Sequence, residues 1–131
     1  MAGLVPRELT PATATAVTDG GATETVVLTS AGVSTPGPNA TVELHGVVNI
    51  TTGTGGTAVV VNVRRGATAS GTEVGTATTD TSTAGDKYTI PFSIEDTPGD
   101  VAGLVYSVTV TETGASADGT VNYAVIGGII S

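Results

Sequence analysis

The segment Val42–Thr52 alternates apolar and polar side chains, and this alternation constrains the fold more than any other feature of the chain. One face of an extended strand would carry Val42, Leu44, Gly46, Val48 and Ile50. A helix repeats its apolar positions every three or four residues, whereas a strand with one buried face repeats them every two. The same period of two returns in residues 88–94 and 104–110. The sequence therefore predicts β-strands that each bury one face.

Turn-forming residues divide the chain at regular intervals. Pro-Gly and Asp-Gly pairs and glycine-rich loops stand between the apolar stretches, and no stretch holds the period of a helix. The expected strands are 24–30, 41–51, 57–65, 72–78, 87–94, 103–112 and 119–126. Short strands at this spacing are typical of a sandwich, a jelly roll or a barrel. We expect an all-β fold, an antiparallel jelly-roll sandwich of about eight strands with an extended N-terminal arm.

The core must be built from aliphatic side chains, because the chain has one phenylalanine and no tryptophan. Each buried position therefore removes less apolar surface from water than an aromatic side chain would. Burial of apolar surface between subunits would offset this, so the composition favours an oligomer. The residues expected in the core are Leu44, Val48, Ile50, Ile90, Phe92, Tyr106, Val108 and Val110.

Residues 1–22 differ in composition from the β-domain expected over residues 23–131. Pro6 and Pro11 lack the backbone N–H that a helix or a central strand requires. We expect an extended arm that becomes ordered when a partner receives it, so that its deletion leaves the β-domain folded. The alternative is a frayed terminus. The sizeable apolar anchors of the arm are Leu4, Val5, Leu9 and Val17.

Charge and composition exclude several classes of partner. The formal net charge is −8, and such a surface repels phosphate backbones, so we expect no nucleic-acid partner. No segment reaches the roughly 18 apolar residues that cross a bilayer, so we expect no membrane partner. The chain has no cysteine for a disulfide or a thiolate metal site. The N-terminus lacks the pattern of a secretory signal, which predicts synthesis without export.

Few residues are candidates for catalysis or cofactor binding. His45 is the single histidine, and no nucleophile or orienting acid can be assigned to it, so we expect a surface or interface histidine. Residues 53–58 match the Gly-x-Gly-x-x-Ala dinucleotide fingerprint, but a valine-rich strand follows where that motif needs a helix. We therefore expect a glycine hairpin loop there, no enzyme activity and no cofactor.

Two charged clusters allow more than one interpretation. Glu95, Asp96 and Asp100 surround a Thr-Pro-Gly turn. They either bind Ca²⁺ or bond the amides of their own turn, and the missing EF-hand spacing favours the turn. Arg64 and Arg65 close a strand and point to opposite faces. We expect one of them to pair with a carboxylate across a subunit boundary, and the alternative is a solvated strand end.

Four segments, residues 42–50, 59–66, 88–99 and 105–110, carry a resemblance to a known family in their order and pattern. Over roughly residues 24–126 the chain resembles small jelly-roll proteins of tailed bacteriophages, of the trimeric tumour-necrosis-factor/C1q type. The resemblance implies a capsid decoration (cement) protein. Such a protein would be made in the host cytoplasm and would bind the major capsid protein as a homotrimer on the outer capsid surface of the virion. The alternative is a binding module of a head or tail fibre that recognises a carbohydrate or a host receptor.

Apolar side chains expected at the surface indicate where subunits or a capsid would be contacted. The predicted contacts are Leu4, Val5, Leu9, Val17, Val47, Val60, Arg64, Ile129 and Ile130. The register of the strands points Tyr88, Tyr106 and Tyr123 inward. This disfavours the carbohydrate alternative, because glycan sites usually offer exposed aromatic rings.

Overall fold

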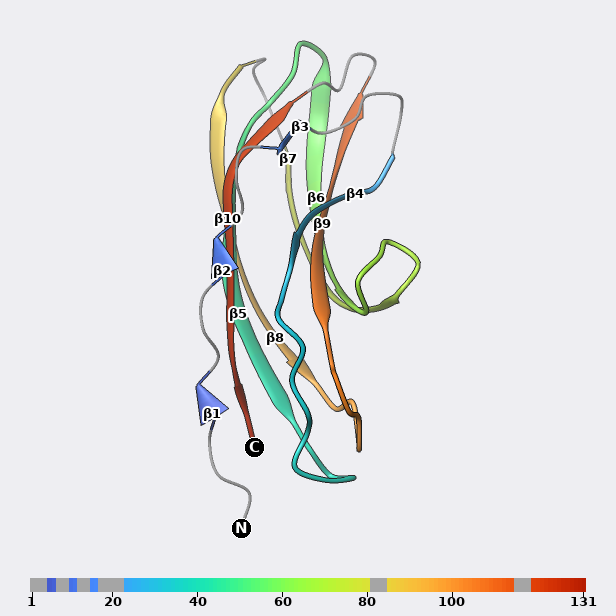
Figure 1. The fold of residues 1–131 in the computed structure, drawn as a ribbon. Coiled ribbons are helices and arrows are strands. Elements are labelled where there is room, and N and C mark those ends of the chain that lie inside the picture. The colour runs from blue at the N-terminus through green and yellow to red at the C-terminus, as the bar shows by residue number, and fades with distance from the viewer. Residues whose placement is uncertain (1–4, 7–9, 12–14, 17–22, 81–84, 115–118) are drawn as a thin grey trace.

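The computed structural model consists of two antiparallel β-sheets packed face to face (Figure 1). It describes residues 5–6, 10–11, 15–16, 23–80, 85–114 and 119–131. The strands in these ranges are β1 (Val5–Pro6), β2 (Thr10–Pro11), β3 (Thr15–Ala16), β4 (Thr25–Thr29), β5 (Val42–Thr51), β6 (Gly56–Arg65), β7 (Thr72–Asp80), β8 (Lys87–Asp96), β9 (Tyr106–Gly114) and β10 (Thr120–Ile130). In the described part of the chain, no helix is long and apolar enough to cross a bilayer.

The long strands form two layers. The three-strand sheet has the order β10-β5-β8, and β1, β2 and β3 pair along the other edge of β10. The four-strand sheet has the order β4-β9-β6-β7. The pairs are nested, because β6 pairs with β7, β5 with β8, β4 with β9, and β10 with the three short strands. In a jelly roll, one long antiparallel hairpin is folded over so that its paired strands are divided between two sheets. With the three short strands counted as one position, the nested pairs give a jelly roll of eight strand positions. The fold class predicted from the sequence is confirmed.

Strand positions follow the alternation in the sequence. Each expected strand is present, and its ends lie within four residues of the predicted ends. The largest difference is in β10, which continues past residue 126 to Ile130. It does so because Gly127 and Gly128 carry on the pairing with His45 and Leu44 of β5.

The core lies between the sheets, and all eight residues expected there are buried. Val48, Ile50, Val108 and Val110 have no accessible surface. The one phenylalanine, Phe92, packs across Gly46. A Cβ at residue 46 would lie 2.2 Å from the Cζ atom of the ring. Glycine at this position therefore leaves the space that the Phe92 ring needs.

The short strands β1, β2 and β3 together supply the first strand position of the jelly roll. β1 pairs with residues 129–130, β2 with residues 125–126 and β3 with residues 120–121, all antiparallel. For these six described residues, the prediction of an outside partner is corrected, because β10 of the same chain supplies the edge. Val5 lies opposite Ile130 in β1. The other predicted anchors lie outside the described residues; they are Leu4, Leu9 and Val17.

Candidate functional site

The outward side chains of the three-strand sheet form four rows across β10, β5 and β8. In an antiparallel pair, directly opposite residues point to the same side of the sheet. The rows are Tyr123–Asn49–Thr89, Val125–Val47–Pro91, Gly127–His45–Ser93 and Ile129–Glu43–Glu95. These four rows are called the outer face below.

Apolar side chains occupy the second row and part of the fourth. Val47, Val125 and Ile129 are half-buried, and Pro91 is exposed. The solvent side of an antiparallel sheet is usually polar, and contiguous exposed apolar surface marks interaction sites. The outer face therefore has the chemistry of a contact surface, and it brings together Val47 and Ile129, two of the predicted contacts.

Tyr123 lies on this face, so the prediction that its ring points inward is wrong. The register shifts between Val121 and Tyr123, and Asn122 is the extra residue of a β-bulge. A bulge of this kind reverses the orientation of every residue beyond it in the strand. The side chain of Tyr123 is 43% exposed, and it is the one exposed large apolar side chain among the described residues. Alternation in the sequence cannot reveal such a bulge.

Amide side chains link the three strands beside Tyr123. Nδ2 of Asn122 donates to Oδ1 of Asn49 at 2.8 Å and to Oγ1 of Thr51 at 2.9 Å. Nδ2 of Asn49 in turn donates to Oγ1 of Thr89 at 2.9 Å. These bonds fix the bulge in place, so the orientation of Tyr123 is held by side chains from all three strands.

Two carboxylates lie at the other end of the outer face. Glu43 of β5 and Glu95 of β8 are directly opposite partners, and both are exposed. Neither takes part in an ion pair within the part of the chain that the structure describes. In the neighbouring row, Oγ of Ser93 lies 3.2 Å from Nδ1 of His45. The outer face thus combines an apolar middle with a negatively charged end.

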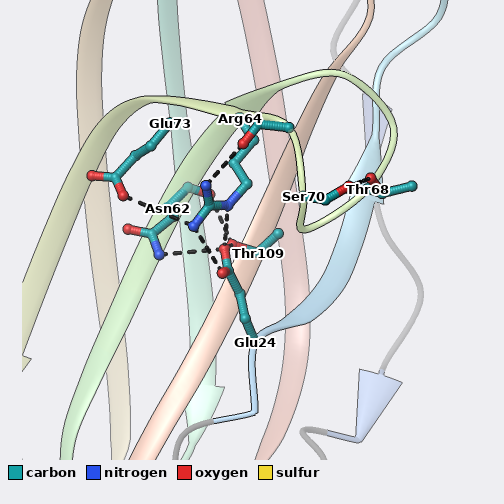
Figure 2. Close-up of polar contacts among 8 residues, drawn as sticks. Glu24, Asn62, Arg64, Thr68, Ser70, Glu73 and Thr109 are labelled. Atoms are coloured by element: carbon teal, nitrogen blue, oxygen red, sulfur yellow. Dashed lines mark hydrogen bonds and ion pairs between the residues drawn. The ribbon is translucent and has the colours of Figure 1, made fainter.

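The opposite side of the sandwich carries a polar cluster around Arg64 (Figure 2). Nε and Nη2 of Arg64 donate to the two carboxylate oxygens of Glu24 at 2.6 and 2.8 Å, and Nη1 donates to the carbonyl of Gly71 at 2.9 Å. Thr109 and Asn62 also donate to Glu24. The hydrogen bond from Arg64 lowers the pKa of Glu24 and outweighs burial, which raises it. The cluster ties the start of β4 to β6 and β9.

Arg65 points inward and joins the two sheets. Its Nη2 lies 2.5 Å from Oδ1 of Asp96, and the Tyr106 hydroxyl donates to Oδ2 of Asp96 at 2.7 Å. Burial raises the pKa of Asp96, but the hydrogen bonds from Arg65, Tyr106 and the Thr97 amide, with the charge of Arg65, lower it by more. Burial and the bond to Asp96 raise the pKa of Tyr106. The adjacent arginines point to opposite faces as expected, and both find their carboxylates within the chain, so neither needs one from another subunit.

The other candidates from the sequence have structural roles. The amide of Thr97 donates to Oδ1 of Asp96 at 2.9 Å, so this carboxylate bonds its own turn. Across the described residues, no group of three or more His, Cys, Asp or Glu side chains is placed to hold a metal ion. Residues 53–58 lead into β6, so the helix that a dinucleotide needs does not follow them. The buried carboxylate of Glu112 accepts the amides of Gly53 and Gly119, at 2.8 and 2.7 Å.

The predicted contact residues divide between two surfaces and the core. Val47 and Ile129 lie on the outer face, whereas Val60 and Arg64 lie on the far side of the four-strand sheet. One flat partner cannot touch both sets. The prediction for Ile130 is wrong, because this side chain is 2% exposed and belongs to the core. Continuation of β10 to Ile130 turns Ile129 outward and Ile130 inward.

Sequence reasoning missed Glu24, Asn122 and Val125. Glu24 was not detectable, because its partner Arg64 lies 40 residues away in the sequence. Asn122 and Val125 depend on the bulge, for which the sequence offers no glycine or proline as a signal.

Comparisons with known proteins identify the type of fold. No protein-family model matches the chain, and no curated protein matches its sequence. Among solved structures, the chain is similar to that of the infectious bursal disease virus Gx strain, with a TM-score of 0.59 and 13% identity. It is also similar to the VP2 subviral particle of infectious bursal disease virus, with a TM-score of 0.58 and 12% identity. The alignments cover 95% of this chain and 33% and 32% of the viral chains. The chain thus spans about a third of the viral chains it matches, and the likeness shows a shared fold.

Proposed function

We propose that this chain is a structural virion protein, a decoration protein that binds the major capsid protein on the outer surface of a bacteriophage capsid. The observation that carries the proposal is the apolar row Val125–Val47–Pro91 on the outer face of a capsid-type jelly roll. A decoration protein works by burying area against neighbouring capsid subunits. Such a role requires apolar contact surface and no catalytic group.

The size of the outer face supports a homotrimer as the binding species. A strand of ten residues is about 33 Å long, and three strands are about 14 Å wide, so one face offers roughly 460 Å². A standard interface buries about 800 Å² on each partner. One copy falls short of this area, whereas three linked copies exceed it and gain avidity from simultaneous contact.

Binding to capsids assembled from the major capsid protein of the same virus tests the proposal. Val47→Glu places a charge in the apolar row and should weaken binding at least tenfold, about 1.4 kcal/mol. Val60→Glu is the matched control, because Val60 is also a half-buried outward valine, but on the four-strand sheet. It should change binding less than twofold. Absence of capsid binding by the unchanged protein would refute the decoration role. If only Val60→Glu weakened capsid binding, the contact would be assigned to the four-strand sheet instead.

The exposed ring of Tyr123 favours a second candidate, a carbohydrate-binding module. An aromatic ring beside the amides of Asn122 and Asn49 offers a stacking surface together with hydrogen-bond donors and acceptors. Glycan-array binding that is lost in Tyr123→Ala, together with absence of capsid binding, would place this candidate first.

A further inference from the structure

The outer face contains an electrostatic conflict that no other described residue resolves. Glu43 and Glu95 are opposite partners in adjacent strands, and like charges in this position destabilise a sheet. Both side chains are exposed, and no ion pair compensates them in the described residues. A cation that approaches this end of the face would remove the repulsion and gain two carboxylate partners.

The cationic side chains of the chain are few, and the described ones are placed elsewhere. The sequence has four Lys and Arg residues. Arg64 and Arg65 are held by Glu24 and Asp96. Lys87 begins β8 eight positions before Glu95, which is about 26 Å along a strand. Arg7 lies outside the described residues. Each copy carries a net charge of −8, so a second copy of the chain would bring further negative charge to Glu43 and Glu95.

We propose that the outer face binds a basic protein surface, one that sets lysine or arginine side chains opposite Glu43 and Glu95 and apolar side chains opposite Val47, Val125 and Ile129. The inference rests on the decoration role and names the chemistry of the partner at that same site. Apolar Ile129 lies in the same row as the two carboxylates, so docking on it excludes water from the ion pairs and strengthens them. The apolar contact supplies area, and the carboxylates fix the orientation of the partner.

Charge-neutralising variants of the full chain test the proposal on capsids. Glu43→Gln combined with Glu95→Gln should weaken binding at least tenfold at low salt and reduce the dependence of binding on salt. Asp86→Asn combined with Asp100→Asn removes the same charge at exposed positions off the outer face and should change binding less than twofold. The glutamine variant should also keep or raise the thermal midpoint, since the repulsion is gone. Equal weakening by both double variants, or unchanged binding of the glutamine variant, would overturn the proposal.

A second measurement separates this inference from the decoration role. The ¹⁵N-labelled full chain is titrated with a synthetic peptide of alternating lysine and leucine, followed by amide chemical shifts. Chemical-shift changes concentrated at Glu43, His45 and Glu95 support the proposal, even if the protein binds no capsid in the capsid-binding test. In that case only the decoration role fails. Shifts spread over other exposed carboxylates, such as Asp86 and Asp100, overturn it. Self-association through the outer face, seen by light scattering and abolished by Val47→Glu, overturns it as well.

Discussion

Arg65 of β6 and Asp96 of β8 form an ion pair that joins the two sheets at one end of the core, with Nη2 and Oδ1 2.5 Å apart. Tyr106, which lies opposite Arg65 in β9, donates to the same carboxylate. At the other end of β9, the buried Glu112 accepts two backbone amides from flanking loops. A buried carboxylate therefore fixes each end of the sandwich, and the aliphatic core lies between the two.

Replacement of Asp96 by asparagine should destabilise the fold. The variant keeps the shape of the side chain but leaves the Arg65 guanidinium and the Tyr106 hydroxyl without their charged acceptor. The expected loss is about 2–3 kcal/mol, in the range for hydrogen bonds to charged groups. A fully buried pair would lose more, but the Arg65 side chain is 34% exposed. Urea unfolding measures the loss. Asp100 is an exposed carboxylate on the following loop, so the free energy of unfolding of Asp100→Asn should stay within about 0.5 kcal/mol of the parent value.

Acid should unfold the protein through Glu24 and Asp96. Their ordinary pKa values are 4.5 and 3.8, and both are lowered in the fold. The unfolded chain binds protons more readily at these groups, so their contribution to stability is full above these ordinary values and is lost as pH falls through the lowered ones. The thermal midpoint should be flat from about pH 7 to pH 5 and fall below about pH 4. Glu24→Gln should reduce the size of this fall. If the fall in Glu24→Gln and the fall in Asp96→Asn were both as large as in the parent protein, it would be assigned to other carboxylates.

The strands and the core were predictable because they depend on local alternation. Each strand buries one face, so the alternation of neighbouring residues is enough to predict that Val48 and Val108 are buried. The pairing of the strands does not follow from alternation, because β5 pairs with β8 and β4 with β9 across long stretches of sequence. The outer face was predictable in part from the same alternation, since Val47 is the one apolar residue among the polar positions of Val42–Thr51.

Three features were not predictable because they depend on distant or irregular contacts. The bulge at Asn122 inverts the second half of β10 and has no local signal. The pairs Arg64–Glu24 and Arg65–Asp96 connect residues 40 and 31 positions apart. Pro6 and Pro11 indicated an unpaired arm, but a proline is tolerated on an edge strand, where its missing N–H can face away from the sheet.

Gly46→Ala should overpack the core. The added Cβ would lie 2.2 Å from both the Phe92 ring and the carbonyl oxygen of Val125, so the ring or the backbone of β10 has to move. The expected cost is about 1–3 kcal/mol, measured by urea unfolding. Gly37→Ala is the matched control, because a Cβ there meets nothing within 4 Å. A loss below about 0.5 kcal/mol for Gly46→Ala would show that the ring packs elsewhere.

Deletion of residues 1–20 should lower the thermal midpoint. The sequence alone predicted that the β-domain is indifferent to this deletion. In the fold, β1, β2 and β3 cover the edge of β10, and β10 also contributes Ile126 and Ile130 to the core. Loss of the covering strands removes their hydrogen bonds, and each 1 kcal/mol lost lowers the midpoint by about 3–6 °C in a domain of this size.

The bared edge of β10 should also associate with other chains, because an uncovered strand offers unpaired backbone groups. Light scattering of the truncated protein should therefore show larger species than the parent at equal concentration. Replacement of residues 1–20 by a glycine–serine segment of equal length is the control for chain length, and it should behave like the deletion. A midpoint and a mass equal to those of the parent would show that the three short strands add nothing to the edge. In that case the original expectation of an arm held only by an outside partner would be restored.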